Sequence, residues 1–388
     1  MSQHAFLDAF APRFLHLAPL AGFATLLAHP QTRDFAITNA CVQALLFVPL
    51  AQLPALRTGI MSWVDLAWPC GLVALGVQTK LNAAASANSW RTSLAASMYL
   101  FQGGRMALGA IALVRAGHMT RELPRYLFQF KRWERDWGIT RGSWAFTLMM
   151  QKEIFMQAIA NAGCLVVPGA LMARGAVKGG LRPLEVAGAL LWAMFYAFEH
   201  ASDLQKLGFM QRCKREGLKG ACCDVGFWSL SRHPNYFGEW GVWLSLAVVA
   251  IPSMLDFVRG GGGGGEEGDG GGGGGGDGEG DGDADGGAAV LIKDGRSSSE
   301  GAAAEERGLV GRTGRTGRTG AMELLRKLAL PCVLGASPVS MYLCLTWWTG
   351  AIPAEYWSAQ KRPGCVEEKK NAGSERVRAG GWCMNPTL

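Results

Sequence analysis

The segment Arg232-His233-Pro234-Asn235-Tyr236-Phe237-Gly238-Glu239, called the signature segment below, stands directly before the apolar run Trp240 to Ile251. Charged and amide side chains are costly at membrane depth and usually line a cavity or a substrate path. The alternative is a membrane-interface anchor, in which the basic residues face headgroups and the aromatic rings form a belt. A belt accounts for the aromatic residues but not for Asn235 and Glu239, so the functional site and the anchor both stay open.

The composition favours a membrane protein over a soluble domain. Hydrophobic residues make up 49% of the 388-residue chain, charged residues only 18%, and there are fourteen tryptophans. The whole chain has a net charge of +7, and residues 259–320 have a net charge of −5. The residues outside this segment therefore have a net charge of +12. A basic membrane part suits anionic lipid headgroups or a phosphate-bearing cofactor. We expect no nucleic-acid partner, because no basic face interleaved with aromatic residues occurs outside the membrane-associated segments.

Apolar runs recur along the chain, and few of them carry a charge near the centre. A membrane-spanning helix needs roughly 20 apolar residues. The runs are continuously apolar instead of alternating, which favours helices over a β-barrel. We therefore predict an all-α fold, a multi-pass transmembrane helical bundle of about 6–8 helices. The runs are Phe14–Ala28, Phe35–Leu56, Ile60–Val77, Leu94–Val114, Ile154–Met172, Leu184–Phe198, Phe237–Val258 and Leu328–Trp348.

One insertion interrupts this pattern. Residues 260–287 are almost entirely Gly, Asp and Glu, and residues 311–320 repeat Gly-Arg-Thr. Such a composition cannot bury enough apolar surface to offset chain entropy. We predict a transmembrane bundle over residues 1–258, a disordered low-complexity loop over 259–320, the final transmembrane helix of the same domain over 321–350, and a polar C-terminal tail over 351–388.

Two stretches in the second half of the chain carry a recognisable pattern. The signature segment follows Cys223-Asp224-Val225-Gly226 and Trp228, and Asp203-Leu204-Gln205-Lys206 stands upstream, followed by Phe209. Together they resemble the C-terminal signature of the steroid 5-alpha-reductase-like family of integral membrane proteins. The resemblance implies an oxidoreductase that reduces a carbon-carbon double bond of a lipid or sterol-like substrate with hydride from NADPH. It also implies a multi-pass protein of the endoplasmic reticulum or another endomembrane.

The resemblance assigns roles to particular residues. Arg232 and Lys206 suit the cofactor phosphates, Asn235 and Glu239 suit the nicotinamide carboxamide, and Asp203 matches an acid near the ribose. His233 and Tyr236 complete the expected cofactor-binding set. The substrate-side acid of the family has no residue-by-residue match, so Tyr236 and Asp65 are our candidates for catalysis.

Two acidic positions have competing interpretations. Asp65 lies between two tryptophans, where it could face a substrate or pair with Arg105, the lone base in its apolar run; we favour the pair. Glu199, His200 and Asp203 could hold a metal, but two carboxylates and one imidazole without a fixed fourth ligand are a weak indication. We therefore predict a hydrogen-bonded polar cluster beside a cofactor site and no metal.

The reaction itself has an alternative. A shorter Arg-His-Pro-x-Tyr pattern also occurs in integral-membrane methyltransferases that modify isoprenylcysteine or phospholipid. In such an enzyme Arg232, His233 and Glu239 would hold S-adenosylmethionine beside a lipid acceptor. A third class is a non-enzymatic scaffold that binds a lipid or cofactor. In each case the expected partners are the membrane and a lipid or sterol-like small molecule, with no obligate protein partner evident.

A basic and aromatic stretch, Met119 to Arg141, separates two apolar runs. Amphipathic basic stretches of this kind lie on membrane surfaces, and we predict an interfacial segment here. The positive-inside tendency predicts that residues 115–141 and 206–219 share the cytosolic side.

Overall fold

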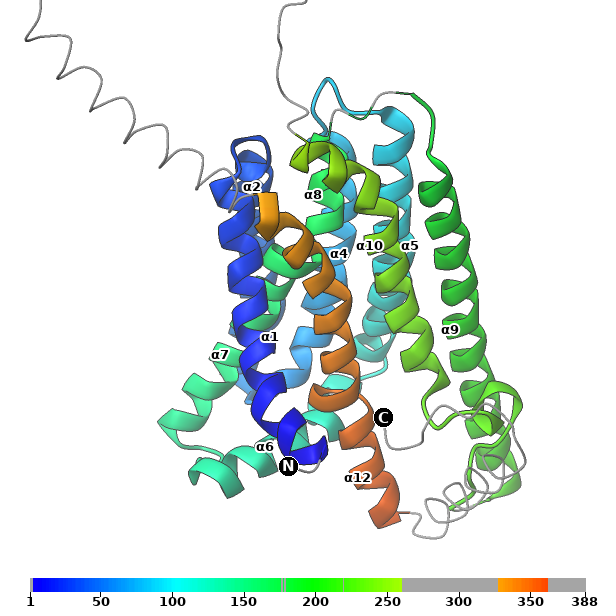
Figure 1. Cartoon of the computed structure of the whole chain (residues 1–388). Coiled ribbons are helices and arrows are strands. Elements are labelled where there is room, and N and C mark those ends of the chain that lie inside the picture. Colours follow the sequence, from blue (N-terminus) through cyan, green and yellow to red (C-terminus); the bar gives the residue numbers. More distant parts are fainter. Residues whose placement is uncertain (1–2, 176, 178, 219, 260–326, 362–388) are drawn as a thin grey trace, which may run out of the picture. The chain divides into compact units, whose positions relative to one another are not determined.

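The protein is a helical bundle in a computed structural model that describes residues 3–175, 177, 179–218, 220–259 and 327–361 (Figure 1). No strand occurs in these ranges. The predicted all-α fold is therefore confirmed. The helices are α1 (Gln3–Ala28), α2 (Pro30–Phe47), α3 (Leu53–Thr58), α4 (Val64–Leu81), α5 (Ser89–Arg115), α6 (Pro124–Trp137), α7 (Trp144–Ala160), α8 (Val167–Arg174), α9 (Pro183–Glu216), α10 (Pro234–Val258), a helix over residues 327–343, and α12 (Ala351–Lys361).

Five helical stretches in the described ranges are long and apolar enough to cross a membrane. They make the chain a multi-pass membrane protein, as predicted. Three further helices, α4, α5 and α9, are also 18 residues or longer and pack in the same bundle. The five stretches are Phe10–Ala28, Pro30–Thr58, Trp144–Arg174, Pro234–Val258 and Lys327–Gln360.

Several spans contain a wide π-helical turn, as in η1 (Val48–Gln52), η4 (Asn161–Leu165) and η6 (Cys344–Trp348). A turn of this kind interrupts the α-helical hydrogen-bond ladder, and the polar groups it frees need partners in an apolar bundle. At η4 the Tyr99 hydroxyl donates to the Leu165 carbonyl at 2.5 Å. The amide of Asn161 donates to Gln43 Oε1 at 3.1 Å. Side chains from α2 and α5 thus stabilise the interrupted span.

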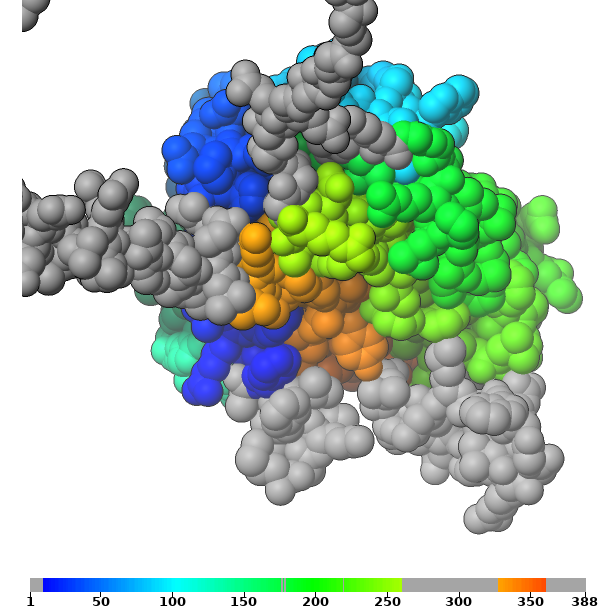
Figure 2. All heavy atoms as spheres, turned by 45° about the horizontal axis from the view of Figure 1, so that its top comes forward, coloured from blue at the N-terminus to red at the C-terminus, as the bar shows by residue number. Residues whose placement is uncertain are grey.

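Helices α9 and α10 pack closely because glycines line the α10 face. A Cβ added at Gly238 would lie 2.8 Å from the Cα of Glu199, and one at Gly241 would lie 2.3 Å from the Phe195 ring. Figure 2 shows α10 between α9 and the helix over residues 327–343, with α1 beyond that helix. The close approach brings the start of α10, which carries the signature segment, against the middle of α9.

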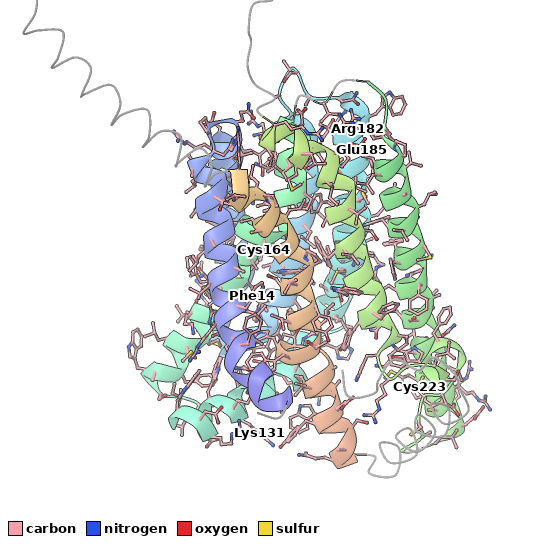
Figure 3. All side chains as sticks on the ribbon, viewed as in Figure 1. Phe14, Lys131, Cys164, Arg182, Glu185 and Cys223 are labelled. Carbon is pink, nitrogen blue, oxygen red and sulfur yellow. The ribbon has the colours of Figure 1, made fainter. Side chains whose placement is uncertain are left out.

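A buried ion pair ties the beginnings of α5 and α9 together. Arg91 donates to both carboxylate oxygens of Glu185 at 2.6 and 2.9 Å, and both side chains are at most 2% exposed. The Arg182 backbone N–H also donates to Glu185, at 2.6 Å. Figure 3 places Arg182 and Glu185 at the end of the bundle opposite Lys131 and Cys223.

Helices α5 and α9 start at this ion pair and run in the same direction, because Arg105 near the end of α5 contacts Glu199 and Asp203 farther along α9. The basic segments that follow, 115–141 and the last turns of α9, therefore lie at the same end of the bundle. In the first of them, residues 124–137 form α6, whose Tyr126, Phe130 and Trp133 are buried. Its outer face is polar, as expected for an amphipathic helix.

Two predicted segments fall largely outside the described residues. The predicted disordered loop over residues 259–320 is one, with only Arg259 described, and the C-terminal tail beyond residue 361 is the other. The first part of the predicted tail forms α12. It continues from the preceding apolar helix after η6 and Gly350, where a Cβ would lie 1.7 Å from the Leu345 carbonyl oxygen.

Candidate functional site

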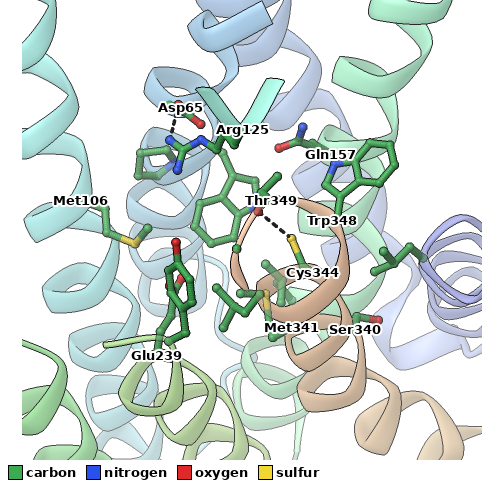
Figure 4. Close-up of a pocket in the computed structure, with 18 of the residues that line it drawn as sticks. Asp65, Met106, Arg125, Gln157, Glu239, Ser340, Met341, Cys344, Trp348 and Thr349 are labelled. Atoms are coloured by element: carbon green, nitrogen blue, oxygen red, sulfur yellow. Dashed lines mark hydrogen bonds and ion pairs between the residues drawn. The ribbon is translucent and has the colours of Figure 1, made fainter. Parts of the chain in front are cut away.

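A cavity of about 440 Å³ lies between α1, α4, α5, α6, α7, α9, α10 and the last apolar helix. This volume is within the range of small-molecule sites, which is roughly 300–1,000 Å³. Figure 4 shows Glu239 and Met106 on one side of the cavity and Gln157 and Trp348 on the other. The predicted site residues that line it are Asp65, Asp203, Asn235, Tyr236 and Glu239.

One guanidinium organises the wall formed by α5, α9 and α10. Arg105 contacts Glu199 through Nη2 and donates from Nη1 to Asp203 Oδ2 at 2.9 Å. Asn235, at the start of α10, donates to the other oxygen of Asp203 at 3.1 Å. Gln102 donates to Glu199 at 3.1 Å. The predicted hydrogen-bonded cluster at Glu199 and Asp203 therefore exists, and its centre is an arginine from α5.

Glu239 adds a third carboxylate to this wall. It is 9% exposed and lies one helical turn after Asn235 on α10. Among the residues that the structure describes, no hydrogen bond reaches the Glu239 carboxylate or the Tyr236 hydroxyl. The amide oxygen of Asn235 is buried and also has no hydrogen-bond partner. An amide acceptor, a carboxyl group and a phenol are thus left for a ligand.

Asp65 belongs to a second polar group, formed by α4 and α6. Its carboxylate accepts from Arg125 Nη2 at 2.5 Å and from the Tyr126 hydroxyl at 2.5 Å. The predicted pairing of Asp65 with Arg105 is wrong. Arg105 instead contacts Glu199 and Asp203 of α9, and Arg125 is the partner of Asp65. Arg125 was expected on an interfacial surface segment, but α6 lies against the first turn of α4 and turns this side chain towards the cavity.

Charges in this second group stabilise one another. Burial acts against the charged form of Arg125, but the Asp65 carboxylate outweighs it and raises the pKa of Arg125. Burial, and then the Asp65 anion, raises the pKa of Tyr126 well above its usual range. Tyr126 therefore stays a neutral phenol that donates to Asp65, and Arg125 stays charged.

Arg232 and His233 do not line the cavity. Arg232 donates to Glu355 of α12 at 3.0 Å, and His233 Nε2 lies 3.4 Å from the same oxygen. The His233 ring stacks on the Tyr236 ring with centroids 5.3 Å apart. Two further guanidinium nitrogens of Arg232, Nε and Nη2, are buried and find no hydrogen-bond partner within the described ranges. The signature segment thus presents its amide, phenol and carboxylate to the cavity and its two basic residues to α12.

Lys206 takes a separate position. It is exposed, and its ammonium lies 4.3 Å from the centroid of the Trp228 ring. The neighbouring Gln205 accepts from the Phe227 backbone N–H at 2.9 Å, and the Trp228 indole donates to the Ser202 carbonyl at 2.7 Å. The Asp-x-Gln-Lys stretch therefore fixes the loop that leads into the signature segment.

The cavity lining contains five carboxylates, two guanidinium groups and one imidazole. Arg125 neutralises Asp65, whereas Arg105 faces Glu199, Asp203 and Glu239 together. The wall at α9 and α10 therefore has an excess of negative charge. In the described ranges, no group of three His, Cys, Asp or Glu side chains has the arrangement of a metal site.

Five of the residues predicted for one site do lie together in the cavity lining. Arg232, His233 and Lys206 were predicted for the same site but lie outside the cavity. Sequence reasoning missed Arg105, Arg125 and Tyr126 as cavity residues. A charged residue inside an apolar run was the available indication for Arg105. No comparable pattern marked Arg125 or Tyr126, which stand among several similar residues of a basic stretch.

A comparison with protein families matches residues 53–258 to a family described as "Protein of unknown function (DUF1295)". The match covers more than half of the chain. The chain belongs to the DUF1295 family. The DUF1295 match includes the five cavity residues named from the sequence, together with Arg105 and Arg125, and leaves out α1 and the last apolar helix. No curated protein and no solved structure matches the chain.

Proposed function

We propose that this protein is a membrane-embedded, NADPH-dependent reductase of a carbon-carbon double bond in a lipid or sterol-like substrate. One observation carries the proposal: on one wall of a cavity inside a transmembrane bundle, Asn235 Oδ1, the Tyr236 hydroxyl and the Glu239 carboxylate have no hydrogen-bond partner among the described residues. Polar groups at such depth are costly to keep without use. We place the protein in the endoplasmic reticulum or another endomembrane, where lipid substrates reach the bundle.

The acceptor groups on this wall fit the nicotinamide end of the cofactor. The carboxamide NH₂ group needs acceptors, and Asn235 Oδ1 and the Glu239 carboxylate are both available. NADPH, when bound, supplies a hydride. The excess negative charge around Arg105 favours a ring that becomes positively charged as hydride leaves. Asp203, held by Arg105 and Asn235, is then placed to accept from a ribose hydroxyl.

The phosphate end requires cations outside the cavity. Arg232 still has two buried nitrogens that no described residue hydrogen-bonds, and Lys206 is exposed and precedes it in the chain. Arginine binds phosphate through two parallel N–H groups, so an arginine held by Glu355 through one nitrogen keeps the rest for an anion. The cavity would thus hold the reacting ring and the substrate, and the signature segment would hold the phosphates beside α12.

The substrate side needs a group that polarises a carbonyl conjugated with the double bond. Tyr236 is our choice, because it lines the cavity and its hydroxyl has no hydrogen-bond partner among the described residues, whereas the Tyr126 hydroxyl donates to Asp65. The nearby guanidinium of Arg125 would stabilise negative charge that develops on the carbonyl oxygen. Asp65 then acts indirectly, as the positioning residue that holds Arg125 and Tyr126.

A second candidate is an S-adenosylmethionine-dependent methyltransferase acting on a lipid or on isoprenylcysteine. The excess of carboxylates around Arg105 favours it specifically, since a sulfonium group is a cation before reaction. This reading requires no carbonyl-polarising group and leaves Tyr236 without a role.

Ligand-induced thermal stabilisation separates the two candidates, because a ligand that binds only the native state raises the melting temperature. The detergent-purified chain is titrated with NADPH and with S-adenosylmethionine, as are Asn235→Ala and Glu239→Gln. The matched controls are Asn82→Ala, at the end of α4 remote from Asp65, and Glu134→Gln, on the outer face of α6. NADPH stabilisation that is lost in the two test variants and kept in the controls supports the reductase. Stabilisation by S-adenosylmethionine alone would overturn the reductase proposal.

A further inference from the structure

The cavity has a second polar wall, formed by α1 and α7, that the proposed reaction does not use. His16 on α1 and Glu153 and Gln157 on α7 line it. Figure 4 shows Gln157 beside Trp348, on the side of the cavity away from Glu239. A ligand that reaches both walls therefore meets polar groups at both of its ends.

Glu153 and Gln157 are four residues apart on α7 and so share one helix face. Both lie within the apolar span Trp144–Arg174. The Glu153 side chain is only 5% exposed. A carboxylate inside an apolar span is expensive and by default points to a functional site.

Glu153 already has basic neighbours. Lys152 Nζ lies 3.1 Å from one of its oxygens, and His16 Nε2 lies 3.7 Å from the other. Lys152 already supplies a cation to this carboxylate, so a ligand gains little by bringing another one to this wall. An anionic ligand group would be repelled by Glu153 at close range.

Gln157 contributes the opposite kind of group. Its amide nitrogen is buried and has no hydrogen-bond partner in the part of the chain that the structure describes, which leaves a donor to satisfy. Next to an acceptor on Glu153, this donor favours a neutral group that can accept and donate at once. A hydroxyl does both, whereas a ketone only accepts and an amine at neutral pH is a cation.

We infer that Glu153 and Gln157 form a recognition site for a hydroxyl group at the end of the lipid substrate remote from its reacting double bond. The inference rests on the proposed reductase for the position of the double bond, at the wall of α9 and α10. Gln157 Nε2 donates to the hydroxyl oxygen, and the hydroxyl donates to Glu153.

The test uses two probes, an enone sterol with a hydroxyl at the end opposite its ketone and the same sterol without that hydroxyl. The dissociation constant of each is measured on the detergent-purified full chain by titrating thermal stabilisation. The variants are Gln157→Leu and Gln157→Met, which remove the donor at similar volume. Gln151→Leu is the matched control, because Gln151 is on the same helix, donates to the Gln52 carbonyl at 3.2 Å and does not line the cavity.

Two hydrogen bonds to the hydroxyl predict about tenfold tighter binding of the hydroxylated probe by the native chain and by the control. In both Gln157 variants the preference should fall to within about twofold, since the remaining bond to Glu153 must work without its companion. Equal binding of the two probes by the native chain, binding of neither, or a preference kept in both Gln157 variants overturns the inference.

NADPH oxidation measured with the same probes separates this inference from the proposed function. A hydroxyl preference without any NADPH oxidation leaves the recognition site standing and overturns the reductase. NADPH oxidation with both probes, at equal dissociation constants, supports the reductase and overturns the recognition site.

Discussion

Arg105 Nη1 donates to Asp203 Oδ2 at 2.9 Å, and the same guanidinium contacts Glu199 one helical turn earlier on α9. A single side chain from α5 therefore neutralises part of a charged patch that α9 and α10 share. This relationship sets the position of Asp203 and, through it, of Asn235. The site is thus held by an ion pair between helices that are far apart in the sequence.

Replacing Arg105 by Gln should destabilise the protein strongly. Glu199 is only 4% exposed at its side chain, so it would become a buried charge without a partner. Breaking such a pair costs on the order of 3–5 kcal/mol of unfolding free energy. The double variant Arg105→Gln with Glu199→Gln removes the stranded charge and should recover much of the loss. Denaturant unfolding in detergent is measured for Arg105→Gln, for Glu199→Gln and for the double variant. A double variant that is as unstable as the sum of the two single variants would contradict the ion pair.

The helical fold follows from the sequence because the apolar runs are long and continuous. Their length alone indicates helices, without a helical repeat in the positions of the apolar residues. The residues at which the helices end could not be predicted as well. The run Leu184–Phe198 predicts a short helix, whereas α9 continues to Glu216. It continues because Arg105 neutralises the acidic residues after Phe198 and the later turns extend beyond the apolar part of the bundle. Composition alone cannot report a partner on another helix.

The partner of Asp65 shows the same limit. A carboxylate in an apolar run requires a cation, and the sequence offered Arg105 as the nearest base in a comparable run. The fold instead brings α6 against the first turn of α4, so that Arg125 and Tyr126 reach Asp65 across 60 and 61 residues. The need for a partner could be predicted from physical chemistry, but its identity required the tertiary structure.

Gly238 should not tolerate a side chain. A Cβ there would lie 2.8–2.9 Å from Glu199 backbone atoms, so α9 and α10 would have to separate. Overpacking of this kind costs about 1–3 kcal/mol, and we expect Gly238→Ala to lower the melting temperature. Gly208→Ala, on α9 with no atom within 4 Å of the added Cβ, is the control. That control should be neutral or stabilise by about 0.4–1 kcal/mol. Equal melting temperatures for the two variants would argue against the close helix packing.

Glu122 should make stability depend on pH. It is 8% exposed and accepts from the Met61 and Ser62 backbone N–H groups at 2.6 and 3.0 Å, ahead of α4. Burial nonetheless raises the pKa of Glu122 above its usual 4.5. The folded state then binds the proton more tightly than the unfolded state. The contribution of this group is therefore fully present below the unfolded pKa and is lost as pH rises through the folded pKa.

Melting temperatures of the native chain and of Glu122→Gln, measured from about pH 4 to pH 8, test this sign. The native chain should lose stability relative to the variant as pH rises above the unfolded pKa, and the difference should level off once folded Glu122 has ionised. A native chain that gains stability relative to the variant over the same range would show that the hydrogen bonds from Met61 and Ser62 outweigh burial.

Tyr236→Phe should separate chemistry from cofactor binding. If the Tyr236 hydroxyl polarises the substrate carbonyl, its removal lowers kcat by about 10²–10⁴-fold, the usual contribution of a positioned proton donor. Stabilisation by NADPH should stay within error of the native value, because the ring that stacks on His233 is retained. Tyr342→Phe, on the last apolar helix and not in the cavity lining, should keep full activity. Full activity of Tyr236→Phe would transfer the role to Tyr126, whose hydroxyl would then have to leave Asp65 for the substrate, and Tyr126→Phe would become the inactive variant.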